Sequence, residues 1–223
     1  MLLYSGPLSL FARKVEIALG EKGLAFQRVM VPFTQDQGYQ PKHPEVLRIN
    51  PKAQVPVLID ADQELFDSTL IFEYPEDAYP QPPLYPAGAG PRARCRTIEL
   101  VADEVLLPLI RPLMHRSEPP LADADQQAAR VAAAQATDPA LRRQYLHLQR
   151  LLAGQNYFCG EFSVADIGLF MALLFAQRLK GPGFAETPEL GTWFDRVKAR
   201  PPAGRIAAEI AAADRVLSPA LDG

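Results

Sequence analysis

The pattern of apolar residues changes once along this chain, at a proline-rich stretch over residues 79–91. Before this stretch, short apolar runs typical of strands alternate with segments that have helical periodicity. After it, the patterns are helical, and no segment has the alternation of a strand. The sequence therefore predicts a small α/β unit over residues 1–79, a linker over residues 80–91 and an all-helical unit over residues 92–223.

The first unit is predicted to follow the order strand, helix, strand, helix, strand, strand, helix. Gly6-Pro7 ends the first apolar run, and Lys22-Gly23 marks a helix end because glycine readily adopts the left-handed conformation found there. A helix is also expected to begin near Ser68. The expected strands span residues 2–5, 26–31, 55–59 and 64–66, and a short helix over 45–48 lies in an otherwise irregular polar segment, 34–48.

The second unit is predicted to contain helices over residues 92–115, 138–153, 163–178, 188–198 and 203–216. Asp138-Pro139 is typical of a helix start, with a capping side chain before a proline at the first helical position. Ser163 and Asp166 have the spacing of a capping box, and the helix that follows them is apolar almost all round. This helix is therefore expected to be central in the second unit.

Three prolines indicate irregular helices. Pro75 lies inside the segment 69–77 and is expected to interrupt the helix there, because an interior proline costs about 3 kcal/mol unless the helix bends or ends. Pro108 and Pro112 are expected to bend the first helix of the second unit.

Composition excludes several functional classes. The chain of 223 residues is 48% hydrophobic, and its net charge of −3 comes without a basic cluster, so nucleic acid is not an expected partner. Cys95 and Cys159 form no CxxC and have no histidine pair beside them, which argues against a metal site. We expect both thiols to be buried or incidental rather than reactive. No apolar run approaches a membrane span and no signal peptide is evident, which favours a cytoplasmic protein without a membrane partner.

Four segments then occur in a characteristic order: Ser9-Leu10-Phe11-Ala12-Arg13-Lys14-Val15, Asn50-Pro51-Lys52-Ala53-Gln54-Val55-Pro56, Asp67-Ser68 and Phe162-Ser163-Val164-Ala165-Asp166-Ile167. Together they resemble the glutathione transferase superfamily, and within it a bacterial serine-type cytosolic member. The resemblance covers essentially the whole chain. It implies a thioredoxin-like α/β N-terminal domain that binds glutathione as cosubstrate, followed by an all-α C-terminal domain.

By this resemblance Ser9 occupies the catalytic position. It precedes the first helix, where backbone N–H groups and the helix dipole favour an anion such as a thiolate. Its hydroxyl would donate a hydrogen bond to the sulfur of glutathione. Tyr4 and Ser5 are competing candidates, because some branches of the family use a tyrosine near the end of the first strand. The spacing to Arg13-Lys14 favours Ser9.

The resemblance also implies the binding residues for glutathione. Val55-Pro56 matches the family's cis-proline loop, in which the backbone of the residue before proline pairs with the cysteinyl part of glutathione. Gln54 matches the position whose amide contacts the peptide backbone or the glycyl carboxylate. The carboxylate of Asp67 would meet the γ-glutamyl ammonium, and the hydroxyl and N–H of Ser68 would meet the γ-glutamyl carboxylate.

Further contacts follow from the same resemblance. Phe11 is expected beside the sulfur, and either Lys42 or His43 near the glycyl carboxylate. The pair Ser163 and Asp166 is implied to stabilise the fold rather than to take part in the chemistry.

The implied function is that of a transferase in detoxification, which conjugates or reduces a small, mostly apolar electrophile. A serine at position 9 argues against the branches that form a mixed disulfide with a protein cysteine. Two alternatives remain: a non-catalytic binding or regulatory protein with the same fold, and a carrier of apolar ligands. The resemblance also implies a homodimer, with Leu70, Ile71 and Tyr74 as apolar residues of its contact surface.

Overall fold

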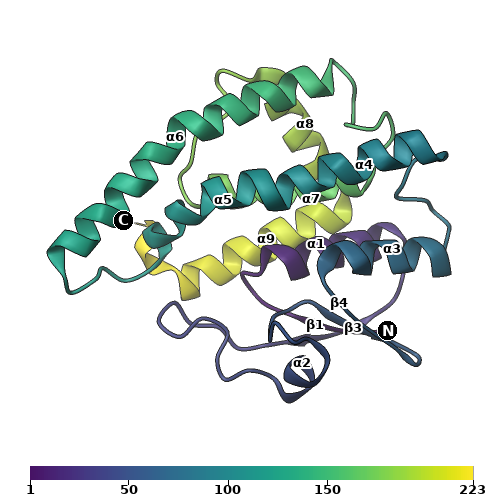
Figure 1. The fold of residues 1–223 in the computed structure, drawn as a ribbon, viewed down its shortest axis with the longest axis horizontal. Coiled ribbons are helices and arrows are strands. Elements are labelled where there is room, and N and C mark those ends of the chain that lie inside the picture. Colours follow the sequence, from purple (N-terminus) through teal and green to yellow (C-terminus); the bar gives the residue numbers. More distant parts are fainter. Residues whose placement is uncertain (223) are drawn as a thin grey trace.

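The apolar runs of the first unit form a single four-stranded sheet in the order β2-β1-β3-β4, seen in the computed structural model, which describes residues 1–222 (Figure 1). β1 (Leu2–Ser5) and β2 (Gln27–Met30) are parallel. β3 (Val57–Asp60) is antiparallel to β1 and forms a hairpin with β4 (Gln63–Phe66). The strands agree with the expected ones to within two residues at each end.

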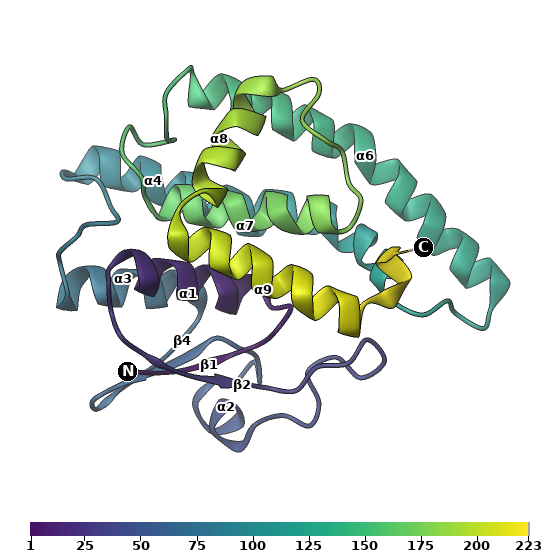
Figure 2. The same cartoon turned by 180° about the vertical axis from the view of Figure 1, so that it is seen from behind.

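The helices of the first unit lie on both faces of this sheet. α1 (Leu10–Glu21) and α3 (Ser68–Ala78) separate the sheet from the second unit, whereas α2 (Pro44–Ile49) covers the opposite face (Figures 1 and 2). α1 ends as predicted, with Lys22 as its cap and Gly23 at φ 66°. Because α1 has neighbours on several sides, nine of its twelve residues are buried.

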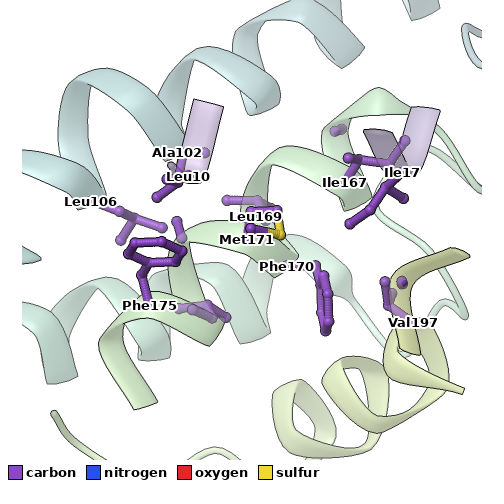
Figure 3. Close-up of a cluster of buried hydrophobic side chains, with 14 of the residues drawn as sticks. Leu10, Ile17, Ala102, Leu106, Ile167, Leu169, Phe170, Met171, Phe175 and Val197 are labelled. Carbon is purple, nitrogen blue, oxygen red and sulfur yellow. The ribbon is translucent and has the colours of Figure 1, made fainter. Parts of the chain in front are cut away.

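The second unit is built around α7 (Val164–Arg178), whose residues are almost all buried. Leu169, Phe170 and Phe175 of α7 pack among side chains from both units, including Leu10 of α1 (Figure 3). The predicted central position of this helix is therefore confirmed. The elements around it are α4 (Ala89–Val101), α5 (Leu107–Ile110), α6 (Ala124–Leu152), α8 (Pro188–Lys198), α9 (Pro201–Leu217) and a 3₁₀ turn over Pro219–Asp222.

The prediction that Pro75 interrupts its helix is wrong, because α3 runs through it to Ala78. Pro75 lies in the last turn, where its missing N–H removes a single hydrogen bond, to the carbonyl of Ile71. The Pro75 carbonyl still accepts from Tyr79 N–H at 3.0 Å. Burial of Phe72 on the same helix stabilises this end of α3.

The predicted helix start at Asp138 is also wrong. α6 begins at Ala124, where the carboxylate of Asp123 accepts from Gln126 N–H at 2.9 Å, and it continues through Pro139. The alanine-rich residues 128–136 have high helix propensity and extend the helix across the proline. The side chain of Asp138 instead accepts from Arg142 Nε at 2.8 Å, one turn further along.

The bend expected at Pro108 and Pro112 takes the form of a change in hydrogen-bond spacing. α4 passes into a π-helical turn over Ala102–Leu106, then into the short α5, and then into a 3₁₀ segment over Arg111–Ser117. Both prolines lie in the first turn of a new segment, where the N–H that proline lacks is not needed inside the helix. The chain therefore stays helical from Ala89 to Ser117 while its hydrogen-bond spacing changes.

A partly buried group of four charges joins the last long helix to the first unit. Arg13, in α1, and Arg28, in β2, both contact the carboxylate of Glu16, which is fully buried. Each arginine also contacts Glu209 of α9, at 2.8 Å from Arg13 and 2.6 Å from Arg28. Two cations and two anions thus neutralise one another where α9 covers α1.

The predicted capping box at the start of α7 is present. Both of its side-chain-to-backbone hydrogen bonds form, and the Asp166 carboxylate also accepts from Phe158 N–H and from Trp193 Nε1 at 2.8 Å. Burial raises the pKa of this carboxyl to about 6. Its several N–H donors favour the ionised form.

We expect Asp166→Asn to lower the free energy of unfolding by about 2–3 kcal/mol, because an amide turns one acceptor into a donor that faces buried donors. Urea unfolding followed by circular dichroism measures the change. Asp195→Asn, on the exposed face of α8, is the matched control and should leave the unfolding midpoint in place. Equal midpoints for the two variants would mean that the capping box adds no stability.

Candidate functional site

Ser9 lies at the start of α1, as predicted. It is the N-cap residue, and its hydroxyl oxygen accepts from Ala12 N–H at 3.2 Å. Within residues 1–222, no acceptor of the protein takes the hydroxyl proton. Ser9 therefore has one hydrogen-bond donor available, at the positive end of a helix dipole.

The two competing residues have other contacts. The Ser5 hydroxyl is fully buried and donates to Glu16 Oε1 at 2.5 Å. Tyr4 packs its ring against His43 with the ring centroids 4.6 Å apart, and burial raises its pKa. Both side chains are part of the packing of the sheet, so Ser9 is the candidate that faces a cavity.

The remaining predicted residues line a small cavity of about 80 Å³, here called the polar cavity. It lies between the loop before β3 and the start of α3. Its walls contain Asn50 and Lys52 together with Phe11, Gln54, Val55, Pro56, Asp67 and Ser68. The peptide bond between Val55 and Pro56 is cis. Six of the predicted residues, from three separate segments of the sequence, thus line one cavity.

A second cavity of about 260 Å³, here called the interdomain cavity, lies next to the first and shares part of its wall. Phe11, Gln54 and Val55 line both. The first unit also contributes Leu8, Ser9, Leu10, Tyr39 and Lys42, and the second unit contributes Leu107, Arg111, Met114 and Phe175. A molecule that extends from the polar cavity therefore meets Ser9 and then a largely apolar wall.

Asp67 stands at the entrance of α3 with its carboxylate available. It caps the helix by accepting from Thr69 N–H at 3.1 Å, and its φ of 74° lies in the left-handed region. A non-glycine residue adopts this conformation only where the surrounding structure enforces it. Lys52 Nζ lies 3.6 Å from the carboxylate, and both side chains are exposed enough to exchange this contact for another partner.

The chain matches two models of one protein family. The description "Glutathione S-transferase, N-terminal domain" covers residues 3–83, and "Glutathione S-transferase, C-terminal domain" covers residues 101–201. Glutathione S-transferase 3 of Zea mays is 31% identical over 212 residues, which span 89% of each chain. The chain belongs to the glutathione S-transferase superfamily.

Two further relatives differ in what their names imply. A stringent starvation protein A homolog of Coxiella burnetii is 39% identical over 98 residues, 44% of each chain. A glutathione S-transferase of Methylobacterium radiotolerans, solved in complex with glutathione sulfonate, has a TM-score of 0.71 at 25% identity over 92% of this chain and 93% of its own. The superfamily assignment confirms the predicted fold, a thioredoxin-like domain followed by an all-helical one.

Of the two candidates for the glycyl carboxylate, Lys42 lines the interdomain cavity. His43 instead caps α2, where its Nδ1 accepts from Glu45 N–H at 3.2 Å. Because that cap and the contact with Tyr4 occupy the ring, His43 has a structural role in this glutathione S-transferase fold.

Sequence analysis missed three residues at the site. Tyr39 accepts from Leu8 N–H through its hydroxyl oxygen at 3.2 Å, and its ring packs against Phe33. Lys52 contacts Asp67, and Asn50 Nδ2 donates to the Gln54 carbonyl at 2.6 Å, which holds the loop before β3. Lys52 and Asn50 lie within the segment 50–56 that carries the resemblance, so the signal for them was present.

One buried lysine fixes the position of the helix that carries Ser9. Lys14 is inaccessible to solvent, and its Nζ lies 2.6 Å from both Glu99 Oε1 and Asp103 Oδ2 of the second unit. The ammonium also lies 5.5 Å from the ring centroid of Phe11 and 5.2 Å from that of Phe72. Burial raises the pKa of Asp103, an effect that Lys14 opposes. The ion pairs join the two units beside Phe11, which lines both cavities.

The described part of the chain, residues 1–222, holds no cluster of three metal-ligating side chains. In the same part, no helix is long and apolar enough to cross a membrane.

Proposed function

We propose that this protein is a glutathione transferase, which holds glutathione in the polar cavity and directs its sulfur at an electrophile in the interdomain cavity. The observation that carries the proposal is that Phe11, Gln54 and Val55 line both cavities, with Ser9 in the wall of the interdomain cavity. Glutathione is then the cosubstrate, and the family supports its binding.

The chemistry of each end of the polar cavity fits one part of glutathione. The carboxylate of Asp67 suits the γ-glutamyl ammonium, and Ser68, buried at the first position of α3, suits the γ-glutamyl carboxylate. The backbone of Val55 would pair with the cysteinyl residue, with the Gln54 amide beside it. This placement directs the thiol towards Ser9 and Phe11.

Ser9 would raise the fraction of glutathione present as thiolate. An ordinary thiol has a pKa of about 8.5, and lowering it by about two units requires roughly 2.7 kcal/mol. A hydroxyl donor to the sulfur contributes about 1.5–3 kcal/mol, and the helix terminus adds to it. The hydrogen bond that Ser9 can donate is therefore strong enough to supply most of the free energy that stabilises the thiolate.

The walls of the interdomain cavity indicate the class of electrophile. Leu8, Leu107, Met114 and Phe175 offer apolar contact, whereas Arg111 adds a positive charge. We therefore expect an acceptor with an apolar body and a polar or acidic group. Conjugation or reduction of such compounds in the cytoplasm, where reduced glutathione is available, is the detoxification role that we assign.

The name of the Coxiella burnetii relative favours a second candidate, a regulatory protein that uses the same fold without turnover. The available Ser9 proton and the open cavities support catalysis over this alternative. A glutathione-affinity column combined with turnover assays on aryl halides, peroxides, epoxides and isothiocyanates separates the two. Binding without turnover of any electrophile would favour a carrier or regulator.

We expect Ser9→Ala to lower kcat/KM by about 10–100-fold, the loss of one hydrogen bond to a charged sulfur, and to shift the pH profile of the rate upward. Glutathione affinity should stay within a few-fold. Ser9→Thr keeps a hydroxyl and should restore much of the rate. Full activity and an unchanged pH profile in Ser9→Ala would remove Ser9 from the mechanism, and Ser5→Ala would be examined next.

We expect Asp67→Asn to weaken glutathione binding about 10-fold or more, because the γ-glutamyl ammonium loses its anionic partner. Asparagine caps helices as well as aspartate does, so α3 should keep its stability. Isothermal titration calorimetry measures the affinity, and Asp62→Asn, in the exposed turn between β3 and β4, is the control. Equal dissociation constants for both variants would contradict the placement of the γ-glutamyl group.

We also propose a homodimer, with α3 and α4 in its interface. Of the three residues named from the sequence, only Leu70 is available, with 58% of its surface exposed, because Ile71 is buried and Tyr74 donates to Asp60 Oδ2 at 2.9 Å. Leu100 on α4 is 54% exposed, and two hydrogen bonds of 2.7 Å between Arg96 and Glu73 join the two helices.

We expect sedimentation at micromolar concentration to give twice the chain mass of 24.6 kDa. The double substitution Leu70→Glu and Leu100→Glu should dissociate the dimer, since two carboxylates would be buried without partners. Val216→Glu, at an exposed site on α9, should leave it intact. A mass of 24.6 kDa at every concentration would reject the dimer without affecting the catalytic proposal.

A further inference from the structure

The two cysteines of the chain, 64 positions apart in sequence, are neighbours in the fold. Cys95 lies in α4 and is fully buried, whereas Cys159 lies between α6 and α7 and is half-buried. Their side chains lie close enough to influence each other's pKa, and the Ser163 side chain influences both thiols. The structure holds both as free thiols. The sequence expectation of incidental thiols did not include this contact.

Cys159 faces a cavity of about 370 Å³, here called the thiol cavity. Its wall includes Pro86, Pro91, Arg94, Gln155 and Phe158, and the polar and interdomain cavities are lined by other residues. A small molecule can therefore reach the sulfur of Cys159 without passing Ser9. Cys95 is hidden from solvent, in contact with Cys159.

The surroundings distinguish the two thiols chemically. The neighbouring thiol of Cys95 lowers the pKa of Cys159, with further help from Ser163 and the positive charge of Arg94, against burial and the charge of Asp166. The contact with Cys159 together with burial raises the pKa of Cys95. At neutral pH the accessible sulfur is thus the better nucleophile, and the buried sulfur keeps its proton.

We propose that Cys159 and Cys95 form a redox-active thiol pair that is oxidised by small hydroperoxides and closes to an intramolecular disulfide. An accessible thiolate with a second thiol in contact is the arrangement in which a sulfenic acid is resolved to a disulfide instead of being oxidised further. The inference does not depend on the proposed transferase activity, because it uses other residues and another cavity.

The reaction balances in two steps. The Cys159 thiolate attacks the hydroperoxide, so that the O–O bond breaks, a sulfenic acid forms on Cys159, and the released alkoxide or hydroxide takes a proton from water. The sulfur of Cys95 then attacks the sulfenic sulfur, an S–S bond forms, and the Cys95 proton leaves with the hydroxyl group as water. Two equivalents of a thiol reductant return both cysteines to the free form and are themselves oxidised to a disulfide.

The test treats the full chain with hydrogen peroxide near stoichiometry, followed by intact-mass and peptide mass spectrometry. We expect the wild type to lose two hydrogens and to yield a cross-linked peptide pair containing Cys95 and Cys159, reversed by dithiothreitol.

The Cys95→Ala variant should stop at a sulfenic acid on Cys159, which dimedone traps. The Cys159→Ser variant should form neither the sulfenic acid nor the disulfide. Circular dichroism of each variant verifies the fold, and the wild-type peptide map stands by itself if a variant unfolds.

Arg94→Gln should slow the oxidation several-fold, whereas Arg143→Gln, an equally exposed arginine on α6, should not. A Ser9→Ala variant should oxidise at the wild-type rate, which separates this pair from the transferase site. The proposal is overturned if the wild type keeps both thiols, or if oxidation forms a disulfide between two chains instead of within one. It is also overturned if glutathione disulfide forms the bond and hydroperoxides do not.

Discussion

The ion pairs of Lys14 are the contacts on which the rest of the structure depends. An ammonium inaccessible to solvent has two carboxylates at 2.6 Å, both supplied by the other unit. Removing one partner of a buried pair costs about 3–5 kcal/mol, because the remaining charge is left without compensation. The docked second unit therefore helps to hold α1 in place. The positions of Ser9 and Phe11, both near Lys14 on the same helix, therefore depend on this contact.

The irregular segment after α4 serves the same site. Glu99 and Asp103 are four positions apart and so lie on one side of their helix, towards Lys14. The π-helical turn then leads into α5 and the 3₁₀ segment, from which Leu107, Arg111 and Met114 line the interdomain cavity. Their spacings of four and three keep them on one face although the hydrogen-bond pattern changes. The prolines thus shape the wall that an electrophile would meet.

What could be predicted from the sequence was local or depended on ordered motifs. The strand at residues 2–5, the stop at Lys22-Gly23 and the capping box at Ser163 are encoded within a few residues of one another. Asp138-Pro139 carries the same local signal as a true helix start. The prediction of a helix start there was wrong because an alanine-rich segment upstream extends the helix through the proline. The dipeptide alone does not show whether the helix propensity of the preceding residues outweighs the effect of the proline.

Other roles could not be predicted because they depend on contacts between distant segments. Lys14 resembles any solvated lysine of an amphipathic helix until Glu99 and Asp103 are placed beside it. Tyr39 lies in a loop whose path no periodicity describes. Ile71 and Tyr74 share α3 with Leu70, but only the packed structure separates the covered face from the open one. The contact between Cys95 and Cys159 likewise arises from tertiary packing.

Glu209 has a consequence for the order in which this protein can fold. The carboxylate that neutralises Arg13 and Arg28 belongs to the last long helix, and the chain is synthesised from the other end. Before α9 is available, Glu16 is the one carboxylate of this group that the two arginines can contact. Full pairing of Arg13 and Arg28 therefore requires that α9 has been synthesised and has packed against α1.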